Sequence, residues 1–112
     1  MEIPAQREGG AVIAKASGRI DSSNSRDFHS SLEAAIAQDA TAMVLDFENV
    51  SYISSAGMRV ILLMAKSLQS RGARLVLCSM QDPIREVFKI SGFDKVIPIH
   101  DSRSDAIAAV SA

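Results

Sequence analysis

Short apolar runs along this chain alternate with stretches in which apolar residues recur at helical spacing. The first two runs, Glu2 to Arg7 and Ala11 to Ala16, predict strands joined by Glu8-Gly9-Gly10, because glycine readily adopts the positive φ of a tight hairpin turn. Later runs predict three further strands, at Met43 to Phe47, Leu75 to Cys78 and Val96 to Ile99. The last of these contains Pro98, which has no backbone N–H to donate, so this strand is expected at a sheet edge.

Helical spacing appears between these strands and after the last one. Asp21 to Ser25 is rich in residues that cap helices, and Phe28, Leu32, Ala35 and Ile36 then follow at the spacing of one helical face. The remaining helices are predicted at Gly57 to Gln69, at Asp82 to Gly92 and from Ser102 onward.

The predicted order of elements is ββαβαβαβα. Strands separated by helices of this length indicate right-handed crossovers and a mostly parallel sheet, to which the N-terminal hairpin adds an antiparallel strand. We therefore predict an α/β fold with a mixed sheet of four to five strands and four helices. A chain of 112 residues has the usual size of one domain, so residues 1–112 are expected to form a single domain.

Composition limits the cellular location and the kinds of partner expected for this domain. The apolar share of 47% is ordinary for a globular protein, and the net charge of −1 offers no general attraction to nucleic acid or to anionic lipid. The longest apolar run, Val60 to Ala65, is far shorter than a membrane span, and the N-terminus does not resemble a signal peptide. A single cysteine, Cys78, cannot form an internal disulfide. We expect a cytoplasmic protein without a nucleic-acid or membrane partner.

Candidate catalytic chemistry is sparse. The glycine-rich phosphate-binding motifs are absent, and no Cys or His pair has the spacing of metal ligands. His29 and His100 are interpreted as surface or capping residues, and Cys78 as a small core residue. Asp46 lies at the carboxyl end of a predicted parallel strand, as the acceptor aspartate of a receiver domain does, but the acidic pair that would hold Mg²⁺ is missing. We expect no enzyme activity, no metal site and no cofactor.

Two adjacent serines, Ser54 and Ser55, stand between the predicted strand ending at Phe47 and the helix beginning at Gly57. The first N–H groups of a helix are unpaired, so a hydroxyl or a phosphate is tolerated there. The simplest interpretation is that Ser55 caps the helix by accepting a hydrogen bond from a backbone N–H, worth about 1 kcal/mol. A cap hydroxyl also lies at the surface, so the same serine could be modified.

The second predicted helix carries more apolar residues than one buried face requires. Val60 to Ala65 is apolar at six consecutive positions, which distributes side chains all around the helix. Two explanations remain open: the helix is packed on two sides, or an exposed patch that includes Met58 and Met64 binds a partner.

The serines also lie in a recognisable motif. The run Val50 to Leu62, Val-Ser-Tyr-Ile-Ser-Ser-Ala-Gly-Met-Arg-Val-Ile-Leu, resembles the signature of the STAS-domain anti-sigma factor antagonists, or anti-anti-sigma factors. Gly18-Arg19-Ile20-Asp21 is similar to the Gly-x-[IL]-Asp turn that precedes the first helix in that family. By this resemblance Ser55 corresponds to the phosphoacceptor and Asp21 to the loop aspartate. Ser54 stands where many members carry aspartate, and it is the alternative acceptor.

The resemblance implies a STAS-like fold and a function in transcription regulation by partner switching. The unphosphorylated protein would bind an anti-sigma factor that is also a serine kinase, phosphorylation of Ser55 would release it, and a serine phosphatase would reset it. ATP and Mg²⁺ would belong to the kinase, and the chain would be a monomer or weak dimer. The partner-binding residues expected on this basis are Asp21, Ser54, Gly57, Met58, Arg59 and Met64.

Two other functions compete with this one. In the first, Asp21, Asp46 and the Ser54-Ser55 loop line a pocket for a small phosphorylated ligand or nucleotide. In the second, the chain is a structural subunit of a larger signalling assembly. Thermal shift with ligands would test the first, because a bound ligand raises stability, and size in solution would test the second.

Overall fold

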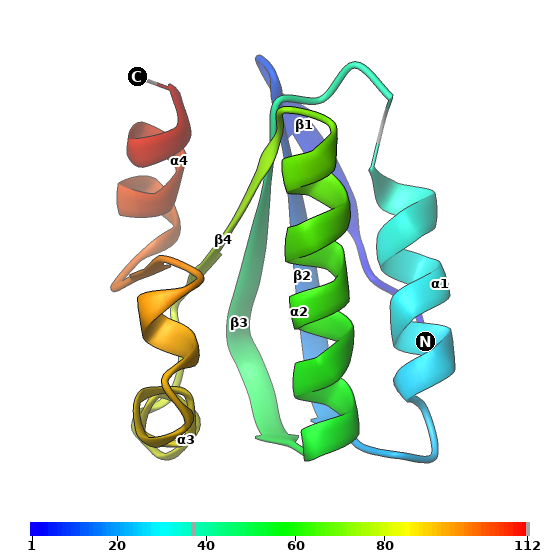
Figure 1. The fold of residues 1–112 in the computed structure, drawn as a ribbon, viewed down its shortest axis with the longest axis vertical. Coiled ribbons are helices and arrows are strands. Elements are labelled where there is room, and N and C mark those ends of the chain that lie inside the picture. Colours follow the sequence, from blue (N-terminus) through cyan, green and yellow to red (C-terminus); the bar gives the residue numbers. More distant parts are fainter. Residues whose placement is uncertain (37, 112) are drawn as a thin grey trace.

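A five-stranded mixed sheet forms the centre of the molecule, in a computed structural model that describes residues 1–36 and 38–111 (Figure 1). The strands, in sheet order, are β1 (Ala5–Glu8), β2 (Ala11–Ile20), β3 (Ala42–Ile53), β4 (Arg74–Cys78) and β5 (Ile99–His100). The helices are α1 (Ser25–Ala35), α2 (Ser55–Ser70), α3 (Asp82–Ser91) and α4 (Arg103–Ser111), with a 3₁₀ turn at Phe93–Lys95. β1 pairs antiparallel with β2 and the other pairs are parallel. The predicted fold class and element order are confirmed.

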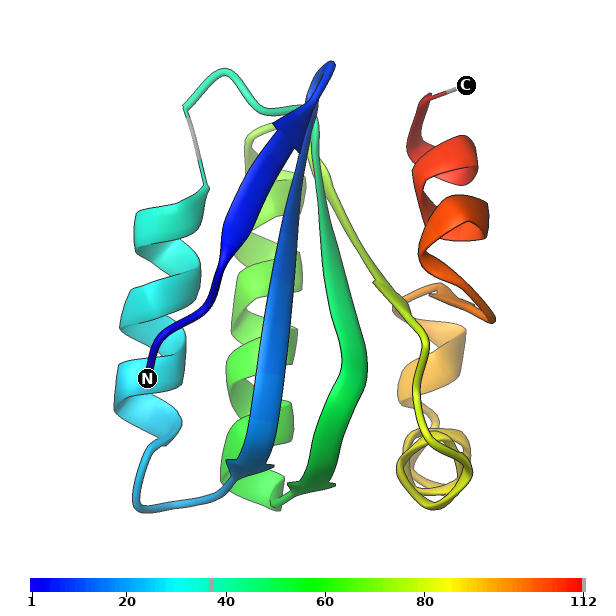
Figure 2. The same ribbon diagram turned by 180° about the vertical axis from the view of Figure 1, so that it is seen from behind.

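Alternating side chains divide the core between the two faces of the sheet. On β3, Met43, Leu45 and Phe47 belong to the larger cluster, which α1, α2 and α3 cover, while Val44 faces a smaller cluster with Ala106 of α4. α1 and α2 lie side by side over one face, and α4 lies on the other side of the sheet (Figures 1 and 2). The side chains of β3 alternate between the two faces of the sheet, so odd-numbered positions such as Leu45 face the larger cluster and even-numbered positions such as Val44 face the smaller one.

β2 and β3 are longer than their apolar runs predict. β3 continues past Phe47 to Ile53, and β2 continues past Ala16 to Ile20, with the two extensions paired to each other across register shifts. β4 accompanies β3 only as far as the pair Asp46 and Cys78. The extended half of β3 therefore has a neighbour on one side only and exposes polar side chains, which explains why composition alone misses it. The extensions bring Ile20 and Ile53 together at the end where α2 begins.

The terminal strands are displaced from their predicted positions. β1 begins at Ala5 rather than Glu2, and β5 is Ile99–His100 rather than Val96 to Ile99. The carbonyl of Pro98 accepts a hydrogen bond from the Leu77 N–H, so pairing with β4 begins only beyond the proline ring. The edge position predicted from Pro98 is confirmed. In the described part of the chain, no helix combines the length and the apolar character needed to cross a membrane.

Candidate functional site

The junction between β3 and α2 is held by Ser54. Its N–H donates to the carbonyl of Ile20 at 2.8 Å, which fastens the junction to the end of β2. Its hydroxyl accepts a hydrogen bond from the Gly57 N–H at 3.3 Å, so Ser54 is the N-cap of α2. The expectation that Ser55 is the cap is wrong by one residue, because helical geometry already begins at Ser55.

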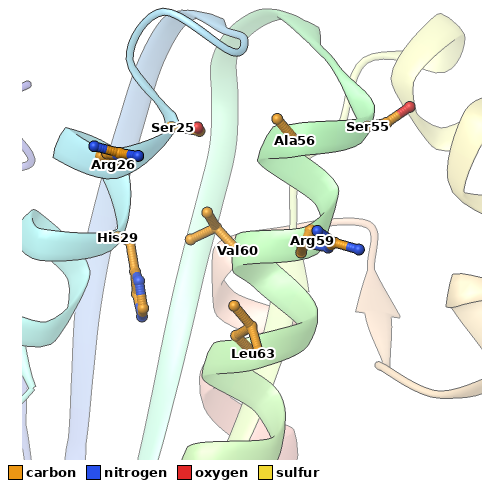
Figure 3. Close-up of a pocket in the computed structure, with 8 residues that line it drawn as sticks. All are labelled: Ser25, Arg26, His29, Ser55, Ala56, Arg59, Val60 and Leu63. Carbon is orange, nitrogen blue, oxygen red and sulfur yellow. The ribbon is translucent and has the colours of Figure 1, made fainter.

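Ser55 is therefore the first residue inside α2, and its side chain is exposed. Among the described residues its hydroxyl makes no hydrogen bond, and Figure 3 shows it pointing away from α1. The two adjacent serines thus differ in chemistry: the Ser54 hydroxyl is engaged by the backbone, while the Ser55 hydroxyl is presented to solvent.

Gly57 lies under this junction and is buried. A Cβ at this position would stand 2.7 Å from Ile20 Cγ2 and 2.8 Å from Ile53 Cγ1, closer than real Cβ contacts come. Gly57 allows the first turn of α2 to rest directly on the ends of β2 and β3. It was predicted as a partner-binding residue, but the structure gives it a packing role.

The predicted methionine patch is absent from the surface. Met58 and Met64 are only 7% and 2% exposed, and both lie in the larger core cluster. α2 packs against the sheet on one side and against α1 on another, so the two-sided explanation for its many apolar residues is correct. Among the large apolar residues of α2, Leu63 is the one that is exposed, at 46%. Sequence analysis missed it because periodicity alone does not show which apolar position of an all-apolar stretch is exposed.

Asp21 begins the loop between β2 and α1. Its carboxylate accepts hydrogen bonds from the N–H and the hydroxyl of Ser23, and these bonds hold the pKa of Asp21 below its ordinary value. Asn24 Oδ1 accepts from the Asp21 N–H, so the loop is closed by its own side chains. Asp21 organises this loop rather than capping α1 directly. Because Ile20 bonds to Ser54, the loop begins beside the serine junction.

An open groove of about 590 Å³ runs between α1 and α2 next to the junction (Figure 3). Val60 and Leu63 supply apolar surface, while Arg26 and Arg59 supply positive charge from opposite helices. Neither arginine makes an ion pair or hydrogen bond within residues 1–36 and 38–111. The remaining lining residues are Ser25, His29, Ser55 and Ala56. Of the groove's charged residues only Arg59 was predicted, because the packing of α1 beside α2 brings in Arg26.

Asp46 lies apart from this junction, on the face of the sheet that α4 covers. It is only 3% exposed, and one carboxylate oxygen is 2.9 Å from Arg103 Nε while the other accepts from the Glu48 N–H. Seven residues of β3 lie between it and Ser54, and at about 3.3 Å per residue the path is roughly 25 Å long. The alternative pocket that combines Asp21, Asp46 and the serines is therefore not formed.

The remaining candidate reactive residues are Cys78, His29 and His100. His100 lies in β5, and its Nε2 is buried without a hydrogen-bond partner among the described residues, so the surface or capping role expected for it is wrong. Cys78 is fully buried, and burial raises the pKa of its thiol, as expected for a core cysteine. His29 Nε2 lies 2.8 Å from Glu33 Oε1, one turn along α1. Within the described residues, no group of three or more His, Cys, Asp or Glu side chains could hold a metal ion.

Comparison with known proteins agrees with this fold. The STAS domain family model matches residues 2–106, and the chain belongs to this family. BtrV of Bordetella bronchiseptica, provisionally named as an anti-sigma factor antagonist, is 39% identical over 109 residues, covering 97% of this chain and 94% of BtrV. The anti-sigma F factor antagonist of Paenibacillus polymyxa is 26% identical over 108 residues, covering 96% and 92% of the two chains.

The anti-sigma factor antagonist SpoIIAA of Bacillus shares the fold at low sequence identity. Its unphosphorylated form superposes with a TM-score of 0.81 at 21% identity, covering 98% of this chain and 96% of SpoIIAA. Its phosphorylated form gives a TM-score of 0.72 at 22% identity, covering 97% and 99%.

Proposed function

We propose that this chain is an anti-sigma factor antagonist that works by partner switching, with Ser55 as its phosphorylation site. The observation that carries the proposal is the contrast between the serines: Ser54 is engaged as the cap of α2, whereas the Ser55 hydroxyl is exposed and unpaired among the described residues. The names of the relatives BtrV and the Paenibacillus protein support the assignment, and SpoIIAA shows that a domain of this fold exists in a phosphorylated form.

In the unphosphorylated state the chain binds an anti-sigma factor that is also a serine kinase, and so releases the sigma factor or other client that the kinase holds. The contact surface comprises the serine junction, the Asp21 loop and the groove beside Arg59 and Leu63. Leu63 takes the place of the two methionines in this surface, because it is exposed and they are not. The positive rim of the groove favours a partner surface with negative charge.

Phosphorylation then ends the complex. The Ser55 oxygen bonds to the γ-phosphorus of ATP, ADP leaves with the electrons of the broken P–O bond, and the hydroxyl proton passes to a base on the kinase. The phosphate adds roughly 1.5 to 2 negative charges at the edge of the docking surface. Since the partner is complementary to the uncharged hydroxyl and a basic groove, this charge meets repulsion and a desolvation cost. A serine phosphatase restores the hydroxyl.

This function assigns no catalytic step to the chain, which is the substrate and the binding module. We take residues 1–112 as one STAS domain that acts in the cytoplasm as a monomer or weak dimer. ATP and Mg²⁺ remain with the kinase.

The test is to mix the protein with candidate anti-sigma kinases, with and without ATP, and to map the phosphate by mass spectrometry. We expect binding without ATP, release with ATP, and phosphate on Ser55 alone. Ser55→Ala should bind the kinase in both conditions, whereas Ser54→Ala should remain a substrate. Full phosphorylation of the Ser55→Ala protein would refute the site, and a chain that binds no candidate kinase at all would refute the function.

A further inference from the structure

Ser55 and Arg59 occupy the same side of α2, one turn apart. Residues i and i+4 of a helix are neighbours, with Cβ atoms about 5–6 Å apart, and helical side chains lean toward the N-terminus. This spacing places the Arg59 side chain within reach of a group attached to Ser55. In Figure 3 the Ser55 hydroxyl and the Arg59 guanidinium lie on the side of α2 away from α1, without pointing at each other, while Val60 projects toward α1.

Arg59 is the cation best placed to meet a group attached to Ser55. It is exposed and has neither an ion pair nor a hydrogen bond among the described residues. Arg19 is already engaged: its guanidinium lies 4.3 Å from the ring centre of Tyr52, and Nε lies 3.9 Å from Asp21. Arg26 belongs to α1, on the opposite wall of the groove.

We propose that Arg59 binds the phosphate on Ser55 within the same chain. This inference rests on the proposed function, since it concerns the state that the kinase creates. The guanidinium offers a planar pair of N–H donors that matches two phosphate oxygens, and charge-assisted bonds of this kind are stronger than neutral ones.

The pairing gives phosphorylation two effects on the docking surface. It adds negative charge at Ser55, and it also engages the positive side chain that the free groove offers from α2. Phosphorylation of Ser55 thereby changes both the charge at this edge of the docking surface and the hydrogen-bond donors that it offers. Arg26 on α1 keeps its positive charge. A partner that uses Arg59 in the unphosphorylated complex loses that contact when the phosphate forms.

The experiment uses the full chain with phosphoserine incorporated at position 55 during translation, so that no kinase is needed. The second ionisation of the phosphate, ordinarily near pH 6, is followed by ³¹P NMR across a pH titration. A nearby guanidinium stabilises the dianion and lowers the midpoint. We expect the Arg59→Gln phosphoprotein to titrate about half a pH unit higher than the parent, the range of an exposed charge-assisted pair.

Two matched variants distinguish a direct pair between Arg59 and the phosphate from a general effect of nearby positive charge. Arg26→Gln removes an equal charge from the other wall of the groove and should shift the midpoint much less. Arg59→Lys keeps the charge without the planar fork and should titrate between the parent and Arg59→Gln. High salt should shrink the difference, because exposed pairs are screened.

Equal midpoints for the parent and Arg59→Gln would overturn the inference, as would a larger shift in Arg26→Gln than in Arg59→Gln. Because the titration needs no partner, its result is independent of the kinase experiment. A failed kinase experiment with a clear Arg59 shift would refute the proposed function and leave the pairing standing; the opposite combination would refute only the pairing.

Discussion

Two arginine sites in this molecule differ in what they bind. Arg103, at the start of α4, contacts the buried carboxylate of Asp46 at 2.9 Å, so both charges are satisfied within the chain. Arg59, on α2 beside Ser55, has no acidic partner in the described residues. The first site joins a helix to the sheet. The second site leaves the Arg59 guanidinium free to bind a partner next to the exposed Ser55 hydroxyl. The Arg103 pair therefore has a structural role, whereas Arg59 belongs to a surface that can bind other groups.

The largest expected effect is on the structural pair. Arg103→Ala leaves the Asp46 carboxylate buried without its cation, and we expect a loss of about 3 kcal/mol in the free energy of unfolding, the lower end for a broken buried pair. The control is Arg85→Ala, which breaks the exposed pair with Asp101 and should cost under about 1 kcal/mol. Urea denaturation measures both. Equal losses would show that the buried pair has no special structural importance.

The next largest effect tests whether Gly57 has a packing role rather than a binding role. In Gly57→Ala the new methyl group would stand 2.7 Å from Ile20 Cγ2 and force the first turn of α2 away from the sheet. We expect a loss of about 2 kcal/mol by denaturation, typical of overpacking. Ala56→Gly, at the neighbouring helical position, tests general helix propensity and should cost about 1 kcal/mol at most. An unaffected Gly57→Ala protein would mean that the junction tolerates displacement.

On the functional side, Leu63→Asp places a negative charge in the groove beside Arg59. We expect kinase affinity to fall about tenfold, or about 1.4 kcal/mol, while the free energy of unfolding stays within about 0.5 kcal/mol. Met64→Asp is the contrasting variant, and it should unfold the protein because Met64 is buried. Calorimetry and circular dichroism distinguish the two. Unchanged affinity in Leu63→Asp would remove this groove from the docking surface.

The two serines should differ in their contribution to the free energy of unfolding, because only Ser54 caps α2. Ser54→Ala removes the cap of α2 and should cost about 1 kcal/mol. Ser55→Ala removes no side-chain hydrogen bond to any of the described residues and should cost less than about 0.5 kcal/mol. Thermal denaturation of the pair measures the difference. If Ser55→Ala proved the more destabilising of the two, the cap would be misassigned.

The smallest effect concerns Asp21. Its folded-state pKa is lowered, first by the Ser23 hydroxyl, so the stability that it contributes is present above its unfolded pKa and is lost as pH falls through the folded value. Asp21→Asn should remove that acid-dependent part, so the variant should be slightly less stable than the parent at neutral pH, and denaturation at a series of pH values should show the difference shrinking as the pH falls. If the carboxylate also orients the kinase, phosphorylation of Asp21→Asn will be slower; unchanged rates and affinity would leave Asp21 as a loop residue only.

Local signals in the sequence account for most of the elements. Helix α3 begins at Asp82-Pro83 and is ended by Gly92, whose φ of 80° is the left-handed conformation that glycine adopts readily. The hairpin turn includes Gly9 at φ 58°. These features depend on a few consecutive residues, so the chain itself specifies them. The extended half of β3 was missed because its stability comes from pairing with β2 rather than from its own polar composition.

The sequence alone determined the order of elements and the position of a serine pair between a strand and a helix, because period and cap chemistry are local. Tertiary structure decided which serine is the cap, because the Ile20 carbonyl holds Ser54 in extended geometry. It also decided that Met58 and Met64 face the core while Leu63 faces solvent, since only the packing of α1 and the sheet around α2 selects among apolar positions. The pairing of Asp46 with Arg103, 57 residues away in the chain, depends on where the last helix docks.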